Sequence, residues 1–456
     1  MEKIQLLQER KAKLENAAKE IRNDIEAIID EGSFVELSAF SFSKNDFYNE
    51  SVAGEGVVTG FATLDGYPFY IVAQNYKVCD GGMSKANCDK IVKCLDLADK
   101  NRTPVIYLLN THGVQVGEGV TVLEGLGNLL LTCVQNNHYA PQYVVVNGDV
   151  YGSAALLASI ADFSFFVEKK SVLAVNSPFV LSAKAGKNVG KEEVGSAKAL
   201  KNTGLPSFEV KDLSEVREKI LALKSLSVEP IIDAELNESL PELNECANVE
   251  KMLSVFESYI ELNAAYEPEV KTVLGRIGGI SVAAILFDGG EDGVELDAGK
   301  FAKLKDFVDN VVMASSFPLI TFANVKGIAP CMNVNNSRAL KEAASYLKLF
   351  EMLETPKIAV VYKKAIGLGY SLFASKSIGF DYTCAFANAK IALFDSVQGA
   401  QIEMAGESID QAALAARYAD ENSDPVHAAK DGYIDAIIEP QFVKQYLISA
   451  LQMLAE

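Results

Sequence analysis

Four glycine-bearing loops are the segments of this sequence best suited to chemistry. They lie at 111–119, 148–154, 326–331 and 366–370, and each follows an apolar run and precedes an expected helix. Glycine lets a backbone approach a ligand closely, and the first amides of a helix have no partner within it. Such amides stabilise negative charge, as on a phosphate or a thioester enolate. Two matched pairs of loops favour an anion-stabilising role over simple strand-to-helix turns.

Acid–base side chains are sparse beside these loops. The histidines His112, His138 and His427 stand in unrelated contexts, and only His112 falls within a loop. A local loop contact is the favoured interpretation of His112, and a general acid or base is the alternative. Glu118 is the nearest acid in the same loop, and a charge at a helix N-terminus explains it most simply. The sequence predicts no metal site, and it contains no P-loop, no GxSxG elbow and no GxGxxG opening a helix.

Alternating strand and helix signals indicate the elements that position the loops. An amphipathic helix is expected over 1–30, followed by strands at 59–62 and 69–73 joined by a turn at Asp65-Gly66. A helix, DKIVKCLDLADK, then precedes a buried strand at 103–110. A further helix and the strand QYVVVNGDV follow the first glycine loop. This alternation predicts an α/β fold.

The second half of the chain repeats the first at an offset of about 215 residues. FPLITFANVKG parallels TPVIYLLNTHG, and the strand, loop, helix and closing strand at 356–396 parallel those at 141–177. We therefore expect a duplicated domain in which Thr103–Asn110 and Phe317–Asn324 are equivalent central strands. The expected organisation is an N-terminal helix at 1–30, a first domain at 31–226, an acidic linker at 227–250 and a second domain at 251–456.

Composition narrows the class of protein. The chain has 456 residues, with 42 Lys and Arg against 61 Asp and Glu, a net charge of −19. This charge argues against sequence-independent binding to nucleic acid, which needs a dense basic face. Seven cysteines without a CxxC pair indicate thiols in a reducing compartment. No apolar run of ~18 residues and no signal peptide is evident, so we expect a cytoplasmic protein that does not insert into a membrane.

These segments carry a family resemblance that runs from about Asp30 to Pro440. The chain resembles the carboxyltransferase subunit of biotin-dependent acyl-CoA carboxylases and decarboxylases, of the propionyl-CoA carboxylase beta or methylmalonyl- or glutaconyl-CoA decarboxylase alpha type. The resemblance rests on the order and spacing of GEGVVTGFATLDGYPFYIVAQ at 54–74, EEVGSAKALKNTGLPSF at 192–208, RIGGISVAAI at 276–285 and KAIGLGYSLFASKSIGFD at 364–381. It implies two duplicated crotonase-like domains built from ββα repeats.

The resemblance also implies a reaction. An acyl-CoA binds to the first half and biotin to the second, and amides stabilise a thioester enolate while a carboxyl group passes between them. The chain has no MKM-type biotinylation site, so biotin is expected on a biotin carboxyl carrier protein. Biotin carboxylase or membrane decarboxylase subunits are the other implied partners. The working site is expected where the first half of one subunit meets the second half of another, in a homo-oligomer or with a paralogous subunit.

Residue roles follow from the same resemblance. The implied catalytic amides belong to Gly152 and Ser153 on the acyl-CoA side and to Leu368 and Gly369 on the biotin side. The implied acyl-CoA-binding residues are Thr111, His112, Gly113, Val114, Tyr151 and Ala154. The implied biotin-binding residues are Gly327, Ile328, Ala329, Gly367 and Tyr370.

The loops depart from the family's usual sequences. SGGAR is replaced by 111–115, CAGGA by 150–154, GFLPG by 327–331 and YGGAY by 366–370. The changes leave two alternatives beside an active carboxyltransferase. One is a degenerate paralogue that acts as a structural subunit. The other is a different crotonase-type acyl-CoA enzyme, such as a hydratase or thioesterase, which would need a carboxylate pair near Gly152. The acyl group and the direction of transfer stay open.

Overall fold

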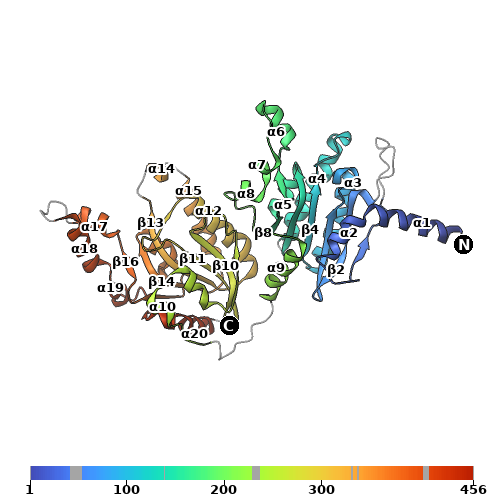
Figure 1. The fold of residues 1–456 in the computed structure, drawn as a ribbon. Coiled ribbons are helices and arrows are strands. Elements are labelled where there is room, and N and C mark those ends of the chain that lie inside the picture. The colour runs from blue at the N-terminus through green and yellow to red at the C-terminus, as the bar shows by residue number, and fades with distance from the viewer. Residues whose placement is uncertain are drawn as a thin grey trace. The chain divides into compact units, whose positions relative to one another are not determined.

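The computed structural model describes residues 2–41, 54–137, 139–227, 237–329, 332–335, 338–403 and 410–454. The chain divides into two compact units, Met1–Ala222 and Leu223–Glu456, and each is built around one sheet of mostly parallel strands (Figure 1). The predicted α/β class is therefore confirmed. None of the described helices is both long enough and apolar enough to cross a bilayer.

The first unit contains a sheet in the order β1-β2-β3-β4-β5-β6-β8, with β7 beside β5. Its first three strands pair antiparallel, and the others pair parallel. The strands are β1 (Val35–Leu37), β2 (Val57–Leu64), β3 (Tyr67–Gln74), β4 (Val105–Thr111), β5 (Gln142–Tyr151), β6 (Phe163–Val167), β7 (Val172–Ala174) and β8 (Phe208–Val210). The helices are α1 (Glu2–Ala17), α2 (Lys19–Glu26), α3 (Lys85–Asn101), α4 (Val120–Asn137), α5 (Ser153–Ile160), α6 (Pro178–Ala185), α7 (Lys191–Gly195), α8 (Ala197–Leu200) and α9 (Leu213–Ser225), which continues past the boundary between the units.

The second unit contains a sheet in the order β17-β15-β14-β13-β11-β10-β9, with β12 beside β13 and β16 beside β14. The strands are β9 (Ser258–Leu262), β10 (Val270–Ile277), β11 (Ile280–Phe287), β12 (Val294–Leu296), β13 (Leu319–Ile328), β14 (Lys357–Ile366), β15 (Tyr382–Phe386), β16 (Lys390–Ala392) and β17 (Ala436–Ile438). The helices are α10 (Glu242–Glu245), α11 (Val249–Met252), α12 (Ala298–Phe307), α13 (Met313–Ser315), α14 (Met332–Asn335), α15 (Ala339–Met352), α16 (Leu368–Phe373), α17 (Ser396–Glu403), α18 (Gln411–Asn422), α19 (Pro425–Lys430) and α20 (Val443–Leu454).

The two units share one topology, as the internal repeat predicts. In the order along each sheet, β1 to β8 match eight of the nine strands β9 to β17, all except β12, and β4 and β13 are equivalent central strands. Even a small irregularity recurs, because a shift in register precedes Thr111 on β4 and Val325 on β13. The short pairing of β12 with β13 corresponds to a single bridge between Met83 and Val114 in the first unit.

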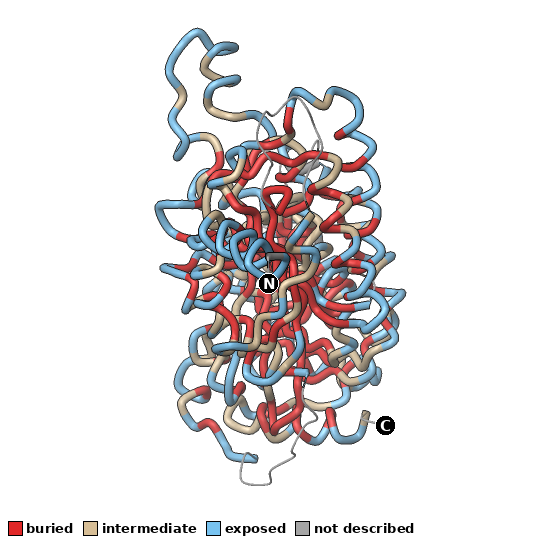
Figure 2. Tube along the Cα trace, turned by 90° about the vertical axis from the view of Figure 1, so that its right-hand side faces the viewer, coloured by how far each residue is buried: buried red, intermediate tan, exposed pale blue. Residues whose placement is uncertain are grey.

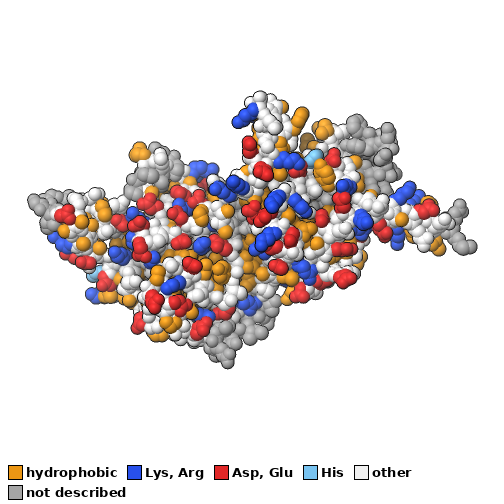
Figure 3. All heavy atoms as spheres, viewed as in Figure 1, with side chains coloured by type: hydrophobic (Ala, Val, Ile, Leu, Met, Phe, Trp, Pro, Cys, Tyr) orange, Lys and Arg blue, Asp and Glu red, His pale blue; other side chains and the backbone are white. Residues whose placement is uncertain are grey.

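Apolar strands and helix faces form the core of each unit. In the first unit, α3, α4 and α5 pack on one face of the sheet through buried residues such as Ile91, Leu126 and Leu157. Strands such as β11 are buried along their whole length, as expected for strands covered on both faces. Figure 2 shows the buried residues concentrated inside the molecule. On the face drawn in Figure 3, acidic and basic side chains lie interspersed.

Each unit also buries a lysine at an equivalent place on the helix after its first hairpin. The Nζ atom of Lys90 on α3 donates to the carbonyls of Gly54 and Val57 at 2.9 and 2.6 Å. The Nζ atom of Lys303 on α12 donates to the carbonyls of Asn263 and Tyr266 at 3.1 and 2.6 Å. Burial lowers the pKa of both lysines to about 8. The carbonyls replace the water that each ammonium loses, so these lysines tie the chain before the hairpin to the helix.

The N-terminal region differs from the single helix that was expected over 1–30. The chain forms α1 and α2, which are separated at Ala18, where φ is −106° and ψ is 10°. Ile21 and Ile25 on α2 are buried, whereas Ile4 on α1 is exposed. In Figure 1, α1 leads away from the sheet of its own unit. Only the C-terminal part of the apolar stripe, on α2, therefore packs against the rest of the first unit.

The segment expected as an acidic linker is partly folded. Residues 228–236 lie outside the described residues, but the remainder packs within the second unit. The N–H of Leu240 donates to the carbonyl of Gln441 at 2.8 Å, and Leu243 on α10 is buried. These contacts make the segment from 240 onward part of the second unit, since its leucines are buried there.

Candidate functional site

The two predicted acyl-CoA loops meet at the carboxyl ends of β4 and β5. Thr111 ends β4, and Tyr151 ends β5, its neighbour in the sheet. Gly113 has φ +106°, and a Cβ atom there would lie 3.3 Å from the carbonyl oxygen of Tyr151. Gly152 has φ +68°, and its Cβ would lie 3.9 Å from the Cα of Gly113. Glycine is favoured at both positions, because positive φ strains other residues.

The backbone amides at the start of α5 do not all remain available. The N–H of Gly152 lies within hydrogen-bond distance of the carbonyls of Ala174 and Val175, at 3.2 and 3.1 Å. It is thus committed to the end of β7. The N–H groups of Ser153 and Ala154 have no hydrogen-bond acceptor among the described residues. The predicted pair of free amides, Gly152 and Ser153, is therefore wrong for Gly152, and the free pair at the start of α5 is Ser153 and Ala154.

The second unit repeats this arrangement on the predicted biotin side. Gly367 has φ +55° and donates its N–H to the carbonyl of Ala392, at the end of β16, at 2.9 Å. The amides of Leu368 and Gly369 at the start of α16 have no acceptor among the described residues. Gly327, with φ +99°, approaches the carbonyl of Ile366 as Gly113 approaches that of Tyr151. The register of the repeat thus aligns Gly152 with Gly367. The amides that correspond to Leu368 and Gly369 are therefore those of Ser153 and Ala154, one residue after the predicted pair of Gly152 and Ser153.

The remaining predicted biotin-side residues surround the same loop. Ile328 is the last residue of β13 and pairs with Leu296, and Ala329 follows it. The hydroxyl of Tyr370 donates to the carbonyl of Tyr433 at 3.4 Å. The side chain of Leu368 is half exposed. Pro330 and Cys331, which complete the loop in the sequence, lie outside the described residues.

A polar cluster surrounds His112 on the acyl-CoA side. Its Nε2 atom lies 3.0 Å from the hydroxyl of Tyr76 and 3.3 Å from Oδ2 of Asp149. The same Oδ2 accepts a hydrogen bond from Nζ of Lys191, on α7, at 2.6 Å. The ring of Tyr151 lies 5.8 Å from the His112 ring, centroid to centroid. Three segments far apart in the sequence, around Tyr76, on β5 and at Lys191, thus converge on the loop that follows β4.

Burial raises the pKa of the two phenols of this cluster further above neutral pH. Burial, together with the charges of Asp80 and Asp149, raises the pKa of Tyr76. Burial, together with the charge of Asp149, raises the pKa of Tyr151 to about 12. Both hydroxyls are therefore neutral groups near the loop, able to donate or accept hydrogen bonds.

Sequence reasoning found His112 but not the residues that hold it. Tyr76, Asp149 and Lys191 lie 36, 37 and 79 positions from His112, and no periodic pattern links them. Glu118 has the structural role that was favoured for it, because its Oε2 accepts the N–H of Lys85 at the start of α3 at 2.7 Å. His427 lies on α19 of the second unit, and His138 is outside the described residues.

A cavity of about 850 Å³ opens beside the polar cluster in the first unit. Asp149 and Lys191 line it, together with residues 167–172 and the segment from Glu192 to Ala199. Its volume falls in the range of ligand-binding pockets. Among the described residues, no group of three or more His, Cys, Asp or Glu side chains is arranged to hold a metal ion.

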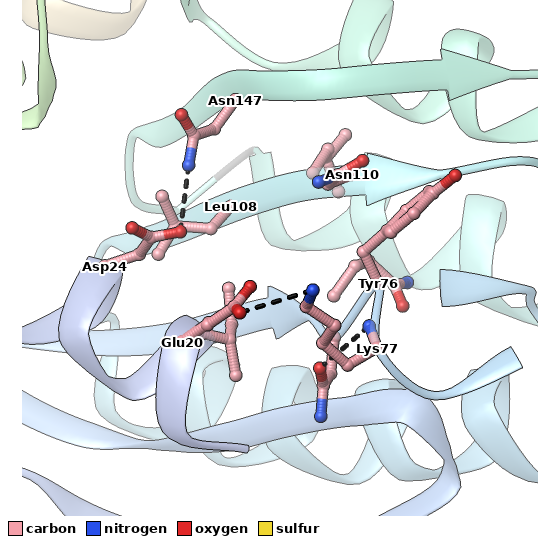
Figure 4. Close-up of a pocket in the computed structure, with 11 residues that line it drawn as sticks. Glu20, Asp24, Tyr76, Lys77, Leu108, Asn110 and Asn147 are labelled. Atoms are coloured by element: carbon pink, nitrogen blue, oxygen red, sulfur yellow. Dashed lines mark hydrogen bonds and ion pairs between the residues drawn. The ribbon is translucent and has the colours of Figure 1, made fainter. Parts of the chain in front are cut away.

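A second, smaller cleft lies on the other side of Tyr76, between α2 and the ends of β3 to β5. Figure 4 shows Asn147 donating to Asp24, at 3.0 Å, and Lys77 paired with Glu20, at 3.3 Å. Its volume of about 50 Å³ is enough for water but not for a coenzyme. The larger cavity is therefore the better candidate for a ligand.

Comparison with known proteins agrees with this architecture. Methylmalonyl-CoA decarboxylase subunit alpha of Veillonella parvula is 27% identical over 490 residues, covering 100% of this chain and 96% of the relative. A putative propionyl-CoA carboxylase beta chain of Bacillus subtilis is 29% identical, covering 95% of this chain and 90% of the relative.

The fold itself matches solved structures. Transcarboxylase 12S, a hexamer solved with methylmalonyl-coenzyme A and methylmalonic acid bound, superposes with a TM-score of 0.88 at 24% identity, covering 99% of this chain and 95% of that one. The predicted pair of crotonase-like domains is thereby confirmed. The carboxyl transferase domain family matches residues 13–456. Because this match spans almost the entire sequence, the chain belongs to the carboxyl transferase domain family.

Proposed function

We propose that this chain is the carboxyltransferase subunit of a biotin-dependent enzyme. It transfers a carboxyl group between an acyl-CoA and biotin carried on a separate protein. Membership of the carboxyl transferase domain family supports the reaction class. The names of its relatives, methylmalonyl-CoA decarboxylase alpha and propionyl-CoA carboxylase beta, support a short acyl-CoA with a carboxylated α-carbon as the substrate class.

The matched pairs of helix-N-terminal amides carry this proposal. Ser153 and Ala154 offer two N–H groups in the first unit, and Leu368 and Gly369 offer two in the second. The first pair stabilises the thioester oxygen as the α-carbon becomes an enolate, since amides held in place act on charge as it develops. Biotin, when bound, supplies the nitrogen that carries the carboxyl group. The second pair holds the ureido oxygen of biotin, a role for which uncharged donors suffice.

A partner subunit completes the proposed enzyme. Biotin arrives on a biotin carboxyl carrier protein, together with biotin carboxylase or membrane decarboxylase subunits. Exposed apolar side chains at equivalent places in the two units support pairing with a second copy or a paralogue. They are Val175 and Leu393, after β7 and β16, and Phe179 and Val397, at the starts of α6 and α17. Side chains of this kind, at matched places, are typical of surfaces that meet a partner.

The experiment measures carboxyl transfer from malonyl-, methylmalonyl- and glutaconyl-CoA to free biotin by the purified protein. Ser153→Pro removes one amide hydrogen at the first position of α5, where proline suits a helix. We expect transfer to fall by on the order of 10²–10³, the typical effect of losing one oxyanion donor. Ser153→Ala keeps the amide, serves as the matched control and should retain most activity.

The biotin side has the same pair of variants. Leu368→Pro should lower transfer by a similar factor and leave acyl-CoA binding unchanged, whereas Leu368→Ala should stay active. If Ser153→Ala were as inactive as Ser153→Pro, the hydroxyl itself would be required and the amide mechanism would be wrong. No transfer from any of the three esters by a folded protein would contradict the proposed function.

A further inference from the structure

We propose that the second unit binds a small anion, of the size of chloride or bicarbonate, between Lys364 on β14 and Lys390 on β16. Three observations support this site: the two lysines lie side by side without an ion-pair partner, a small cleft opens at them, and the first unit has no such pair. The site goes beyond the proposed function and is tested without biotin or an acyl-CoA.

The pairing of the strands brings the two lysines together. Lys364 and Lys390 are direct partners in the parallel pairing of β14 with β16. Side chains in register on neighbouring strands point to the same face of a sheet, and like charges at such positions destabilise it. Burial lowers the pKa of Lys364, and the charge of Lys390 lowers it further, although the charge of Asp395 opposes this shift. The fold thus holds two positive charges next to each other near the carboxyl end of β14.

Neither ammonium group has a carboxylate partner. The Nζ atom of Lys363, the residue before Lys364, lies 2.6 Å from Oε1 of Glu291. Among the described residues, by contrast, no carboxylate oxygen lies within ion-pair distance of the Nζ atom of Lys364 or Lys390. Lys364 donates to the backbone carbonyl of Asp292 at 3.1 Å, a neutral group that leaves its charge uncompensated. The pair therefore has capacity for a ligand of opposite charge.

A cleft of about 30 Å³ opens at the two lysines. A single water needs roughly 10–15 Å³, so this volume suits a small anion and not a coenzyme or biotin. Ser396, the first residue of α17, also lines the cleft. Its hydroxyl makes no hydrogen bond to a described residue and is a further donor, and the start of a helix carries partial positive charge.

The lining of the cleft carries more positive than negative charge. Among the described residues that line it, Asp395 is the one carboxylate, against Lys364 and Lys390. The Oδ1 atom of Asp395 accepts the N–H of Val397 at 3.2 Å, which holds this carboxylate at the start of α17. A local excess of positive charge in a chain with a net charge of −19 favours an anion as the ligand.

The first unit shows that the shared fold does not require this pair. Asp149 stands where the second unit has Lys364, and its partner in the pairing of β5 with β7 is Val172. Lys191 compensates the Asp149 carboxylate at 2.6 Å. One compensated acid thus corresponds to two uncompensated lysines. The lysine pair is therefore a property of the second unit alone.

The cleft adjoins the loop that carries the proposed biotin-side amides. Ala392 lines the cleft, and its carbonyl accepts the N–H of Gly367 at 2.9 Å. Ile366, the residue before Gly367, lines it as well. Leu368 and Gly369 follow in the sequence. The proposed anion site is therefore a neighbour of these amides and does not include them.

The test measures chloride NMR line widths with the full chain, because chloride that exchanges with a protein site broadens the signal of the free ion. Sodium bicarbonate should narrow the line by displacing chloride, whereas sodium gluconate, whose anion is too large for the cleft, should not. Lys390→Gln should weaken chloride binding by about tenfold or more, the effect of losing one hydrogen bond from a charged group. Lys390→Arg keeps the charge and should retain binding.

The matched control is Lys348→Gln, at an exposed position on α15. It removes the same charge from the same unit and should leave the line width as in the unaltered protein. Equal line widths for Lys390→Gln and Lys348→Gln would overturn the inference. Displacement of chloride by gluconate as readily as by bicarbonate would do so too, because it would indicate only general attraction to lysines.

Thermal unfolding gives a second measurement. In gluconate, Lys390→Gln should unfold at the same or a higher temperature than the unaltered protein, since one of two adjacent like charges is gone. Replacing gluconate by chloride should raise the midpoint of the unaltered protein more than that of the variant, because a bound ligand stabilises the folded state. Lys364→Gln gives a second variant if Lys390→Gln does not fold. An equal rise in variant and unaltered protein would contradict the site.

Discussion

Glu55 offers a sharp test of the electrostatics of the first unit. It lies in the short turn Gly54–Gly56, with φ +59°, and is only 1% exposed. Neither of its carboxylate oxygens has a hydrogen-bond partner among the described residues. Burial raises the pKa of Glu55 from 4.5 to about 7, against the opposing charge of Lys90. The perturbation is Glu55→Gln, which keeps the shape and removes the charge.

The sign and size of the effect follow from the raised pKa. Between pH 4.5 and 7 the folded state holds a proton that the unfolded chain has released, so this carboxyl destabilises the fold progressively as pH rises. The cost levels off above pH 7. One pKa unit is worth about 1.4 kcal/mol, so the change between pH 5 and pH 8.5 is roughly 2 kcal/mol. A glutamine amide does not titrate, and any cost of burying it is the same at both pH values.

The assay compares the thermal midpoints of the unaltered protein and Glu55→Gln at pH 5 and pH 8.5. The variant should gain about 5 °C relative to the unaltered protein on going to the higher pH, given the midpoint shift expected per kcal/mol for units of this size. Glu209→Gln, an exposed position on β8, is the matched control and should show no such gain. An equal difference between variant and unaltered protein at the two pH values would refute the buried, unpaired carboxylate.

Three further outcomes are expected. Hydrogen bonding from Arg217 holds the pKa of Asp30 well below its usual value. In denaturant titrations at pH 7, Asp30→Asn should therefore cost about 2 kcal/mol of stability, and this deficit should shrink below pH 4. An unchanged deficit at pH 3 would contradict that ion pair. Phe179→Asp should leave the fold intact but weaken self-association, because this apolar side chain is 83% exposed. If light scattering gave the variant the same molecular mass as the unaltered protein, the surface around Phe179 would not be the contact between subunits. On α4, Gly127→Ala should raise the stability by about 1 kcal/mol, because a Cβ atom there meets open space. Gly125→Ala should lower the stability, because its Cβ would lie 3.0 Å from a backbone atom of α3. Equal thermal midpoints of the two variants in calorimetry would contradict the packing of α3 on α4.

The architecture could be predicted because its signals are local or repeated. Apolar strand segments such as that ending at Thr111, and their partners about 215 residues later, repeat in order, so they define both the α/β class and the duplication. The glycines that begin the helices at Ser153 and Leu368 were found for the same reason. What the pattern could not supply is which amides stay free. That depends on the short strands β7 and β16, whose end carbonyls reach back to Gly152 and Gly367.

Long-range contacts explain the other differences. His112 and Asp149 are 37 residues apart, and only the parallel pairing of β4 with β5 brings them together. The break at Ala18 and the packing of Leu240 depend on surfaces that the rest of each unit provides. A helical stripe or an acidic stretch by itself does not contain that information, because tertiary contacts override local propensity.

The buried lysines permit an inference about history. A gene duplication leaves two copies of every ancestral residue, so one half of the chain serves as an internal reference for the other. Lys90 and Lys303 are the same residue in the same setting, which dates that ammonium to the single-domain ancestor and ties it to folding. His112 and Asp149 align with Lys326 and Lys364 in that comparison, so the two copies differ at these positions. The two copies thus share the buried lysine and differ beside the strands that end at the two amide sites.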